Sequence, residues 1–308
     1  MPAGIIFFGT PEFAVPTLKA LVSKKEKIVL VVTQPDKPKG RGKIIQPCEI
    51  KKIALEFGLN LAQPEKLRDE SFIKKLKELN PEFGVVVAYG KILPKEILEI
   101  PKYGCINLHA SLLPKYRGAA PVQWALIKGE KITGVTTMLI DEGVDTGPVL
   151  LQREVPIEDE DNAQTLAHKL STVGAELIIE TIEKMRKKEI KPEPQKGEPS
   201  YAPQLRKEDG KIKWNLSARE IFNLIRGTYP WPCAYSFLKN ERLKIIKAEV
   251  LEGVAPAGSV VKAKNELIVG TGNGLLRILL IQPEGKKVMT AKEFLSGRKI
   301  NEGVDSFS

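Results

Sequence analysis

The chain has 308 residues, of which 42% are hydrophobic, and its 48 Lys and Arg outnumber its 38 Asp and Glu to give a net charge of +10 at pH 7. A domain averages roughly 150 residues, so this length predicts about two domains. No apolar run approaches the ~20 residues that cross a bilayer, and no secretory signal pattern opens the chain. A cytoplasmic protein without a membrane partner is therefore expected.

The scarcity of metal-binding side chains excludes several classes of site. Cys48, Cys105 and Cys233 are scattered without CxxC spacing, and only two histidines are present, so neither a disulfide framework nor a metal centre is predicted. The positive charge favours a polyanionic partner such as nucleic acid. A mixed Lys and Glu surface is also typical of high-temperature proteins, so charge alone does not decide the matter.

The first 189 residues alternate between predicted strands and helices. Residues 4–8 form an apolar run typical of a buried strand, and Thr10 with Pro11 predicts the cap and first turn of a helix to Leu21. Further strands are expected at residues 28–33, 83–88, 103–109, 134–140 and 149–157, and further helices at 49–57, 71–79 and 161–188. This alternation predicts an α/β fold with a doubly wound, mostly parallel sheet, whose ligands bind beyond the carboxyl ends of the strands.

A change in composition separates this first domain, residues 1–189, from a second one at residues 209–308. Four prolines lie among charged residues between positions 190 and 203, without the apolar periodicity of a packed element, so residues 190–208 are predicted to be an extended linker. Residues 207–308 hold 17 Lys and Arg against 11 Asp and Glu. The positive excess is thus concentrated in the second domain.

The second domain is predicted to be a small β-barrel. Ser217 and Glu220 form a capping box for a helix to Arg226. Short strands are then expected at residues 235–238, 243–250, 259–263, 266–270 and 275–281. About five short strands joined by glycine-rich turns indicate a barrel of the oligonucleotide-binding type.

A strand that ends in polar residues is the main candidate for chemistry. In residues 103–109, strand alternation points the side chains of Asn107 and His109 to the same face. Both can donate a hydrogen bond to a developing oxyanion, and the histidine titrates near neutral pH. Asp145 lies in a glycine-framed loop from which a carboxylate can approach a histidine and set its charge. Taken singly, each residue is more typical of an ordinary turn or loop; together they suit acyl transfer without a covalent nucleophile.

Four motifs follow one another along the chain. They are Phe8-Gly9-Thr10-Pro11-Glu12-Phe13-Ala14, Gln34-Pro35-Asp36 with Gly40-Arg41-Gly42, residues 107–121 from Asn107 to Pro121, and residues 141–148 from Asp141 to Pro148. Together they resemble the methionyl-tRNA formyltransferase family over almost the whole chain. The Asn-x-His and Asp core by itself specifies only folate-dependent formyltransferases as a group.

The resemblance implies a fold, a reaction and a set of roles. It implies a formyltransferase-type Rossmann-like domain in which Asn107, His109 and Asp145 are catalytic. It also implies that four consecutive residues bind the tetrahydrofolate carrier, namely Ser111, Leu112, Leu113 and Pro114. The implied reaction moves a formyl group from 10-formyltetrahydrofolate, without a metal, to the amino group of methionyl-initiator tRNA for translation initiation.

A basic loop after the second predicted strand is a candidate for tRNA binding. It carries four cations separated by proline and glycine, Lys37, Lys39, Arg41 and Lys43. Cations so placed can meet phosphates, and such contacts weaken steeply as salt rises. The resemblance implies that this loop inserts at the acceptor end of the tRNA and that Arg41 is important there; the alternative is a solvated loop.

Other functions remain open from the residues alone. A folate-dependent formyltransferase acting on a small amine, or a formyltetrahydrofolate hydrolase-type domain, would share the catalytic trio but would not need the basic loop or the basic second domain. A non-catalytic tRNA-binding protein would explain the charge but not the trio. An enzyme that acts on one tRNA needs no oligomer, so a monomer is expected.

Overall fold

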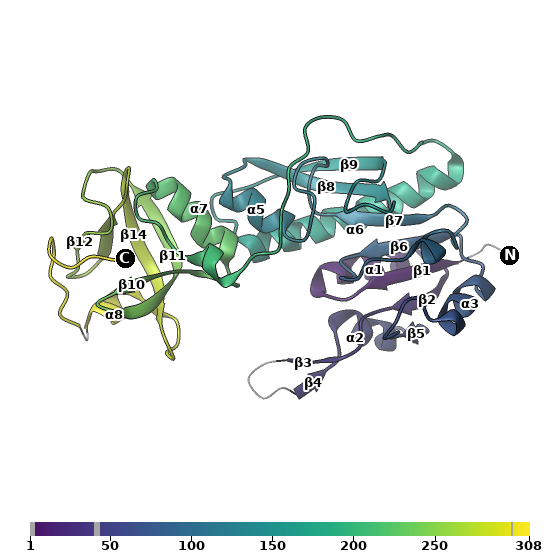
Figure 1. The fold of residues 1–308 in the computed structure, drawn as a ribbon, viewed down its shortest axis with the longest axis horizontal. Coiled ribbons are helices and arrows are strands. Elements are labelled where there is room, and N and C mark those ends of the chain that lie inside the picture. Colours follow the sequence, from purple (N-terminus) through teal and green to yellow (C-terminus); the bar gives the residue numbers. More distant parts are fainter. Residues whose placement is uncertain (1–3, 40–43, 297) are drawn as a thin grey trace. The chain divides into compact units, whose positions relative to one another are not determined.

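The computed structural model describes residues 4–39, 44–296 and 298–308, which form two compact units (Figure 1). The N-terminal unit comprises the residues up to Gly118, Ile132–Pro156 and Ala167–Tyr201, and the C-terminal unit comprises Ala119–Lys131, Ile157–Leu166 and Ala202–Ser308. This division differs from the predicted boundaries because α5, Pro121–Ile127, packs on a helix of the C-terminal unit. No helix within the described ranges is long and apolar enough to cross a membrane.

A seven-stranded sheet forms the centre of the N-terminal unit. Its strands are β1 Ile5–Gly9, β2 Ile28–Val32, β5 Leu61–Ala62, β6 Phe83–Val87, β7 Cys105–His109, β8 Ile132–Leu139 and β9 Val149–Pro156. They lie in the order β5-β2-β1-β6-β7-β8-β9, parallel from β5 to β7, with β8 antiparallel to both of its neighbours. The predicted doubly wound, mostly parallel sheet is confirmed. Its central strands β1 and β6 are buried along their whole length, as expected for a sheet covered on both faces.

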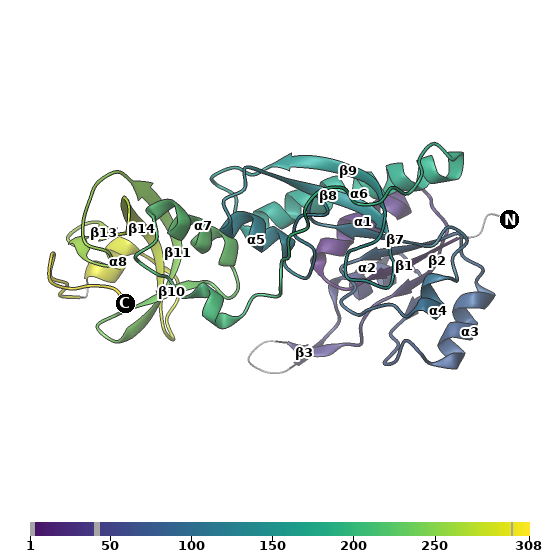
Figure 2. The same cartoon turned by 45° about the horizontal axis from the view of Figure 1, so that its top comes forward.

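Helices cover both faces of this sheet (Figures 1 and 2). They are α1 Val15–Ser23, α2 Glu49–Glu56, α3 Glu70–Glu78, α4 Lys95–Leu98 and α6 Ala163–Lys187. On one face, Phe72 of α3 and Ile97 of α4 join a core cluster that includes Cys105 of β7. On the other face, Thr181 of α6 hydrogen-bonds Thr137 of β8 at 2.8 Å. Because side chains alternate along a strand, Asn107 and His109 lie on the same face of β7 as Cys105, the face that α3 and α4 cover. Ile106 and Leu108 lie on the opposite face.

The predicted start of the first helix is wrong. The chain forms a 3-10 turn at η1, Glu12–Ala14, and α1 begins only at Val15, with Pro16 in its first turn. Thr10 does not cap this helix, because its hydroxyl donates to the carbonyl of Tyr89 at 3.0 Å. The threonine instead joins the loops that follow β1 and β6. These two strands flank the switch in strand order, where open α/β sheets bind their ligands.

The segment after α6, which the sequence predicts to be an extended linker, is bonded to the N-terminal unit. Glu193 pairs with Val149 at the start of β9, and its backbone exchanges hydrogen bonds of 2.7 and 2.8 Å with that residue. Tyr201 pairs with Arg117 in the loop after β7. The segment therefore contributes a wall of that unit before the chain enters the C-terminal unit.

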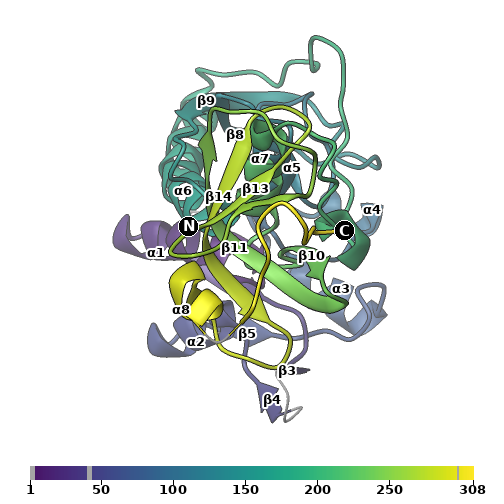
Figure 3. The same ribbon diagram turned by 90° about the vertical axis from the view of Figure 1, so that its left-hand side faces the viewer.

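The C-terminal unit is a curled antiparallel sheet (Figure 3), which confirms the predicted small barrel-like domain. Its elements are η2 Lys207–Gly210, α7 Ala218–Thr228, β10 Ala234–Leu238, β11 Glu241–Leu251, β12 Val260–Lys262, β13 Leu267–Gly270, β14 Leu275–Pro283, β15 Met289–Thr290 and α8 Ala291–Ser296. The strands lie in the order β10-β11-β14-β13-β12, with β15 on β14. The predicted capping box of Ser217 and Glu220 is present at the start of α7.

The last residues of the chain join the two edges of this sheet. Phe307 pairs with Leu238 of β10, and Ser306 pairs with Ser259 just before β12. The ring of Phe307 packs on Trp214, with centroids 5.3 Å apart, and is only 4% exposed. The C-terminal segment thus covers strand edges that would otherwise expose unpaired backbone groups.

Replacing Phe307 tests whether this closure stabilises the unit. We expect Phe307→Ala to lower the free energy of unfolding by roughly 3–5 kcal/mol, the usual cost of removing a buried phenylalanine ring. Urea unfolding followed by circular dichroism measures the change. Val304→Ala, three residues earlier and 78% exposed, is the matched control and should shift stability by less than about 0.5 kcal/mol. Equal effects of the two substitutions would contradict the closure.

Candidate active site

Asn107 and His109 lie on β7, the last parallel strand of the N-terminal sheet. The two side chains are two residues apart and share one face of the sheet, as the sequence predicts. The imidazole of His109 is 6% exposed, whereas Asn107 is half-buried. The Asn107 carboxamide makes no hydrogen bond to any described residue. A donor in this state, beside a buried histidine, is available for a substrate oxygen.

Asp145 reaches His109 because the loop between β8 and β9 folds back along the sheet. Leu139, at the end of β8, pairs with Ile106, yet Asp145 contacts His109 three residues further along β7. A side chain at Gly147 would lie 1.8 Å from the Leu139 carbonyl oxygen, so only glycine permits this close return. Asp145 itself has a left-handed φ of 52°, which aspartate tolerates better than most residues.

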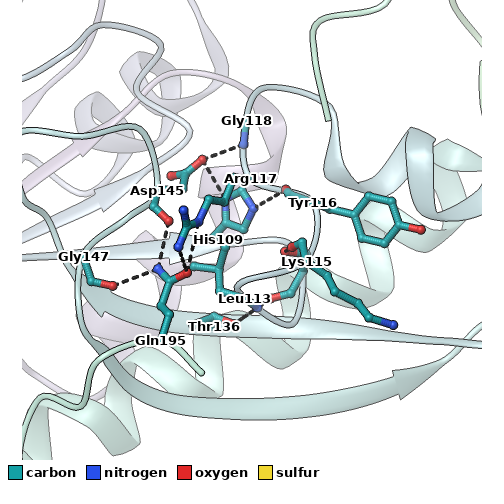
Figure 4. A network of polar contacts seen from close by, with 11 residues as sticks. His109, Leu113, Lys115, Tyr116, Arg117, Gly118, Thr136, Asp145, Gly147 and Gln195 are labelled. Carbon is teal, nitrogen blue, oxygen red and sulfur yellow. Dashed lines mark hydrogen bonds and ion pairs between the residues drawn. The ribbon is translucent and has the colours of Figure 1, made fainter. Parts of the chain in front are cut away.

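The imidazole of His109 lies between two oxygen acceptors (Figure 4). Nε2 is 2.9 Å from the carbonyl oxygen of Tyr116, and Nδ1 is 3.5 Å from Oδ2 of Asp145. A carbonyl oxygen only accepts, so Nε2 must carry a proton, and a second proton on Nδ1 makes the ring a cation that faces the carboxylate. The contact at Nδ1 is longer than a normal hydrogen bond. A proton on Nδ1 can therefore also be donated to another oxygen, such as one of a substrate.

Backbone groups and one amide side chain hold the Asp145 loop in place (Figure 4). The Gly118 amide donates to Asp145 Oδ2 at 2.8 Å. Gln195, from the segment after α6, donates from Nε2 to the carbonyl oxygens of Asp145 and Gly147 at 2.8 and 2.9 Å. Its own Oε1 accepts two hydrogen bonds from the guanidinium of Arg117, at 3.1 and 2.7 Å. One amide therefore ties together three segments that are far apart in the sequence.

The four residues predicted to bind folate lie in the loop after β7, mostly as buried supports. Ser111 is fully buried and its hydroxyl donates to the Lys115 carbonyl at 2.6 Å. Leu113 is 4% exposed, and its amide and carbonyl are bonded to Thr136 and Gln152 of the neighbouring strands. Pro114 is also buried, and Leu112 is partly buried. The geometry makes this loop a scaffold that delivers the Tyr116 carbonyl and the Gly118 amide to the His109 and Asp145 pair.

The basic loop forms a short hairpin where the structure describes it. β3, Lys37–Lys39, pairs antiparallel with β4, Ile44–Gln46. Lys37 is exposed and donates to the Gln34 side chain, and Lys39 is the last residue of β3. Arg41 and Lys43 lie outside the described residues.

A charged cluster fixes the base of this hairpin. Two hydrogen bonds hold the pKa of Asp36 below its ordinary value; the one from Lys51 has the larger effect and the one from Gln63 the smaller. Gln63 also donates to the Gln34 carbonyl at 2.9 Å. The aspartate is thus ionised at neutral pH, which keeps its bond to Lys51 and the hairpin base in place.

Two family models match almost the whole chain. One, described as "Formyl transferase", matches residues 3–182, and the other, "Formyl transferase, C-terminal domain", matches residues 204–299. A methionyl-tRNA formyltransferase of Thermodesulfovibrio yellowstonii is 79% identical over 308 residues, 100% of each chain. The chain belongs to the methionyl-tRNA formyltransferase family. Another relative of this name, from Caldanaerobacter subterraneus subsp. tengcongensis, is 54% identical over 97% of this chain and 98% of its own.

Solved structures agree on the fold. A methionyl-tRNA formyltransferase from Clostridium thermocellum matches with a TM-score of 0.55 at 21% identity, over 80% of this chain and 92% of that one. An N-formyltransferase from Helicobacter canadensis, in complex with folinic acid and dTDP-3-aminofucose, matches with a TM-score of 0.70 at 20% identity, over 90% of this chain and 98% of that one. At these identities the likeness concerns the fold alone.

The sequence did not indicate Gln195, Tyr116 or Gly118 as site residues. Tyr116 and Gly118 contribute a backbone oxygen and a backbone amide, which no residue type reveals. Gln195 lies in the predicted linker, and only its position against the Asp145 loop shows its importance. Arg117, like Tyr116 and Gly118, lies within residues 107–121, a motif shared with the family, but the resemblance implies no role for it.

We expect Gln195→Glu to slow formyl transfer by roughly ten- to a hundredfold, because displacing a reacting group by about 1 Å costs up to ~10²-fold in rate. The glutamate keeps an oxygen acceptor for Arg117 but loses the amide donor to the Asp145 and Gly147 carbonyls. Measurement of kcat and KM for both substrates should place the loss in kcat. Lys196→Gln, at an 82% exposed neighbour, is the control. Full activity of Gln195→Glu would exclude a positioning role for the amide.

Proposed function

We propose that this protein transfers the formyl group of 10-formyltetrahydrofolate to the α-amino group of methionyl-initiator tRNA. The observation that carries the proposal is the grouping of Asn107, His109 and Asp145 at β7, in a chain 79% identical along its full length to a methionyl-tRNA formyltransferase. Both partners, the tRNA and the folate, follow from this family. We further propose that the protein acts as a monomer in the cytoplasm and that no metal takes part.

The site offers what a formyl donor needs in order to react with an amine. When bound, the folate supplies an activated formyl group and a nitrogen that accepts a proton as the bond to the formyl carbon breaks. The half-buried Asn107 carboxamide, which has no partner among the described residues, fits the formyl oxygen. The neighbouring switch in strand order, between β1 and β6, is where such sheets bind ligands. These features support a folate position beside the carboxyl ends of β6 and β7.

Asn107 and His109 then act on the charge that develops during the attack. As the amine nitrogen bonds to the formyl carbon, the formyl oxygen becomes negative, and a fixed carboxamide N–H stabilises it without reorganisation. The Nδ1–H of a protonated His109 is the second donor, because its 3.5 Å contact with Asp145 leaves it free to share its proton. Asn107 has no other hydrogen-bond partner among the described residues, whereas His109 shares its Nδ1 proton with Asp145, so Asn107 is the more available donor to the oxyanion.

Asp145 serves both the histidine and the proton balance. Its Oδ2 faces His109 Nδ1 and accepts the Gly118 amide, so the carboxylate is fixed beside the imidazole. The attacking amine must lose one proton, and the leaving nitrogen of the folate gains one. We assign this transfer to Asp145, directly or through water.

The basic hairpin is assigned to the acceptor end of the tRNA. Lys37 is exposed near the hairpin base, which Asp36 and Lys51 hold in place. Together with Lys39, Arg41 and Lys43 it brings four cations to one loop. Such cations neutralise phosphates.

Removing the Asn107 donor tests the oxyanion assignment. We expect Asn107→Ala to lower kcat by roughly 10²- to 10³-fold, as the loss of one oxyanion donor does in other enzymes. Single-turnover formyl transfer with both substrates saturating measures the chemical step. Asn162→Ala, at the cap of α6, is a control for a lost carboxamide away from the site. A rate in Asn107→Ala within twofold of the wild type would remove Asn107 from the mechanism.

An acceptor comparison tests the function as a whole. We expect rapid formyl transfer from 10-formyltetrahydrofolate to charged initiator tRNA, slow transfer to charged elongator tRNA and no transfer to a dTDP-amino sugar. In the same assay, Arg41→Ala should raise KM for the tRNA far more than KM for the folate. Preference for the small amine would contradict the proposed acceptor, and equal effects of Arg41→Ala on both substrates would contradict the role of the hairpin.

A further inference from the structure

One face of the C-terminal unit brings aromatic and basic side chains together. On β10, Ala234, Ser236 and Leu238 are buried, whereas the alternating Tyr235 and Phe237 are half-buried and point to the outer face. The two rings pack edge to face, with centroids 6.1 Å apart. This alternation is typical of a strand with one face in the core and one face toward solvent.

Three cations surround these rings. The β10–β11 register places Lys244 opposite Tyr235 and Arg242 opposite Phe237, on the same outer face. The Arg242 guanidinium lies 3.9 Å from the centre of the Tyr235 ring, and Lys211 Nζ lies 6.0 Å from that of Phe237. Tyr235, Phe237, Lys211, Arg242 and Lys244 are called the β10 patch below.

The cations of the β10 patch have no carboxylate partners. Across the part of the chain that the structure describes, neither Lys211, Arg242 nor Lys244 forms an ion pair, and the Nε of Arg242 is buried without a hydrogen-bond partner. Several exposed lysines of the same unit also lack an ion pair among the described residues, but they have no aromatic ring beside them, whereas other cations of the unit do have partners. These pairs include Lys239 with Asp305, Lys262 with Glu266, and Arg298 with Glu241.

Cations that stack on aromatic rings and lack internal counter-ions are suited to a polyanion with flat groups. Phosphates neutralise the cations, and exposed ring faces and edges accept bases that are not stacked in a helix. A protein partner would instead need an apolar centre without charge, which this patch does not offer. The chemistry therefore fits single-stranded or looped nucleic acid.

We propose that the β10 patch binds an unstacked nucleotide and its adjoining phosphates in the tRNA. This inference rests on the proposed function, because it takes the tRNA as the substrate. It assigns particular residues of the C-terminal unit to tRNA binding and gives the aromatic pair a role that net charge alone does not supply.

The test compares two triple variants with the same change in net charge. The patch variant carries Lys211→Gln, Arg242→Gln and Lys244→Gln, and the control carries Lys239→Gln, Lys262→Gln and Arg298→Gln. Binding of deacylated initiator tRNA is measured by fluorescence anisotropy over a range of KCl concentrations. We expect the patch variant to lower the slope of log Kd against log salt by about two, since each single-strand phosphate contact contributes roughly 0.7. The control should change it little.

A second variant tests the rings. Phe237→Leu keeps an apolar side chain on the strand and should weaken binding of the same tRNA roughly tenfold at constant salt, because one base loses its stacking contact. Thermal unfolding by circular dichroism establishes that each variant folds. An unchanged affinity in Phe237→Leu would overturn the assignment of the ring to a nucleotide.

The outcomes separate this proposal from the function on which it rests. Absence of formyl transfer to charged initiator tRNA by the wild-type protein would refute the function itself. If the wild-type protein formylates this tRNA but the patch and control variants show equal salt slopes, only the assignment of the β10 patch to tRNA binding is refuted.

Discussion

The carboxylate of Asp145 is held between a backbone amide and the imidazole of His109, with no lysine or arginine bonded to it among the described residues, and the rest of the site depends on this. Its Oδ2 accepts the Gly118 amide at 2.8 Å and faces His109 at 3.5 Å. The loop that carries it is fixed by Gln195, which binds two of its carbonyls. A neutral amide donor leaves the negative charge intact, as the proposed action of Asp145 on the histidine and on the substrate amine requires. A lysine or arginine in its place would have neutralised it.

This arrangement requires the folded N-terminal unit as a whole. The histidine comes from β7, the carboxylate from the loop after β8, and the clamping amide from the segment after α6. Because β8 runs antiparallel to β7, its loop starts beside Ile106 and must return along the strand to reach His109. Gly147 permits that return, since any side chain there would meet the Leu139 carbonyl. The change from parallel to antiparallel pairing thus explains both the glycine and the clamp.

Sequence periodicity predicted the sheet without its short edge strand β5, its helices apart from the four-residue α4, and the shared face of Asn107 and His109, because these follow from local alternation. It failed at Thr10, where a typical capping residue instead bonds the carbonyl of Tyr89, 79 positions away. It also gave Gln195 no role, since a proline-rich segment looks the same whether it is free or bonded to a wall of the site. Contacts between distant segments decide both cases, and no local pattern encodes them.

The two units contribute differently to recognition of a long polyanion. Lysine and arginine contacts with phosphates raise affinity for any tRNA, because phosphates carry no sequence information. In the proposed complex, the hairpin from Lys37 and the cations of the β10 patch therefore add affinity without choosing between tRNAs. Choice requires groups that respond to the shape or stacking of nucleotides. In the C-terminal unit, Tyr235 and Phe237 are such groups, since a ring face accepts a base only where the tRNA leaves one unstacked. Because these rings lie among cations without carboxylate partners, the proposed surface combines attraction of phosphates with a response to unstacked bases.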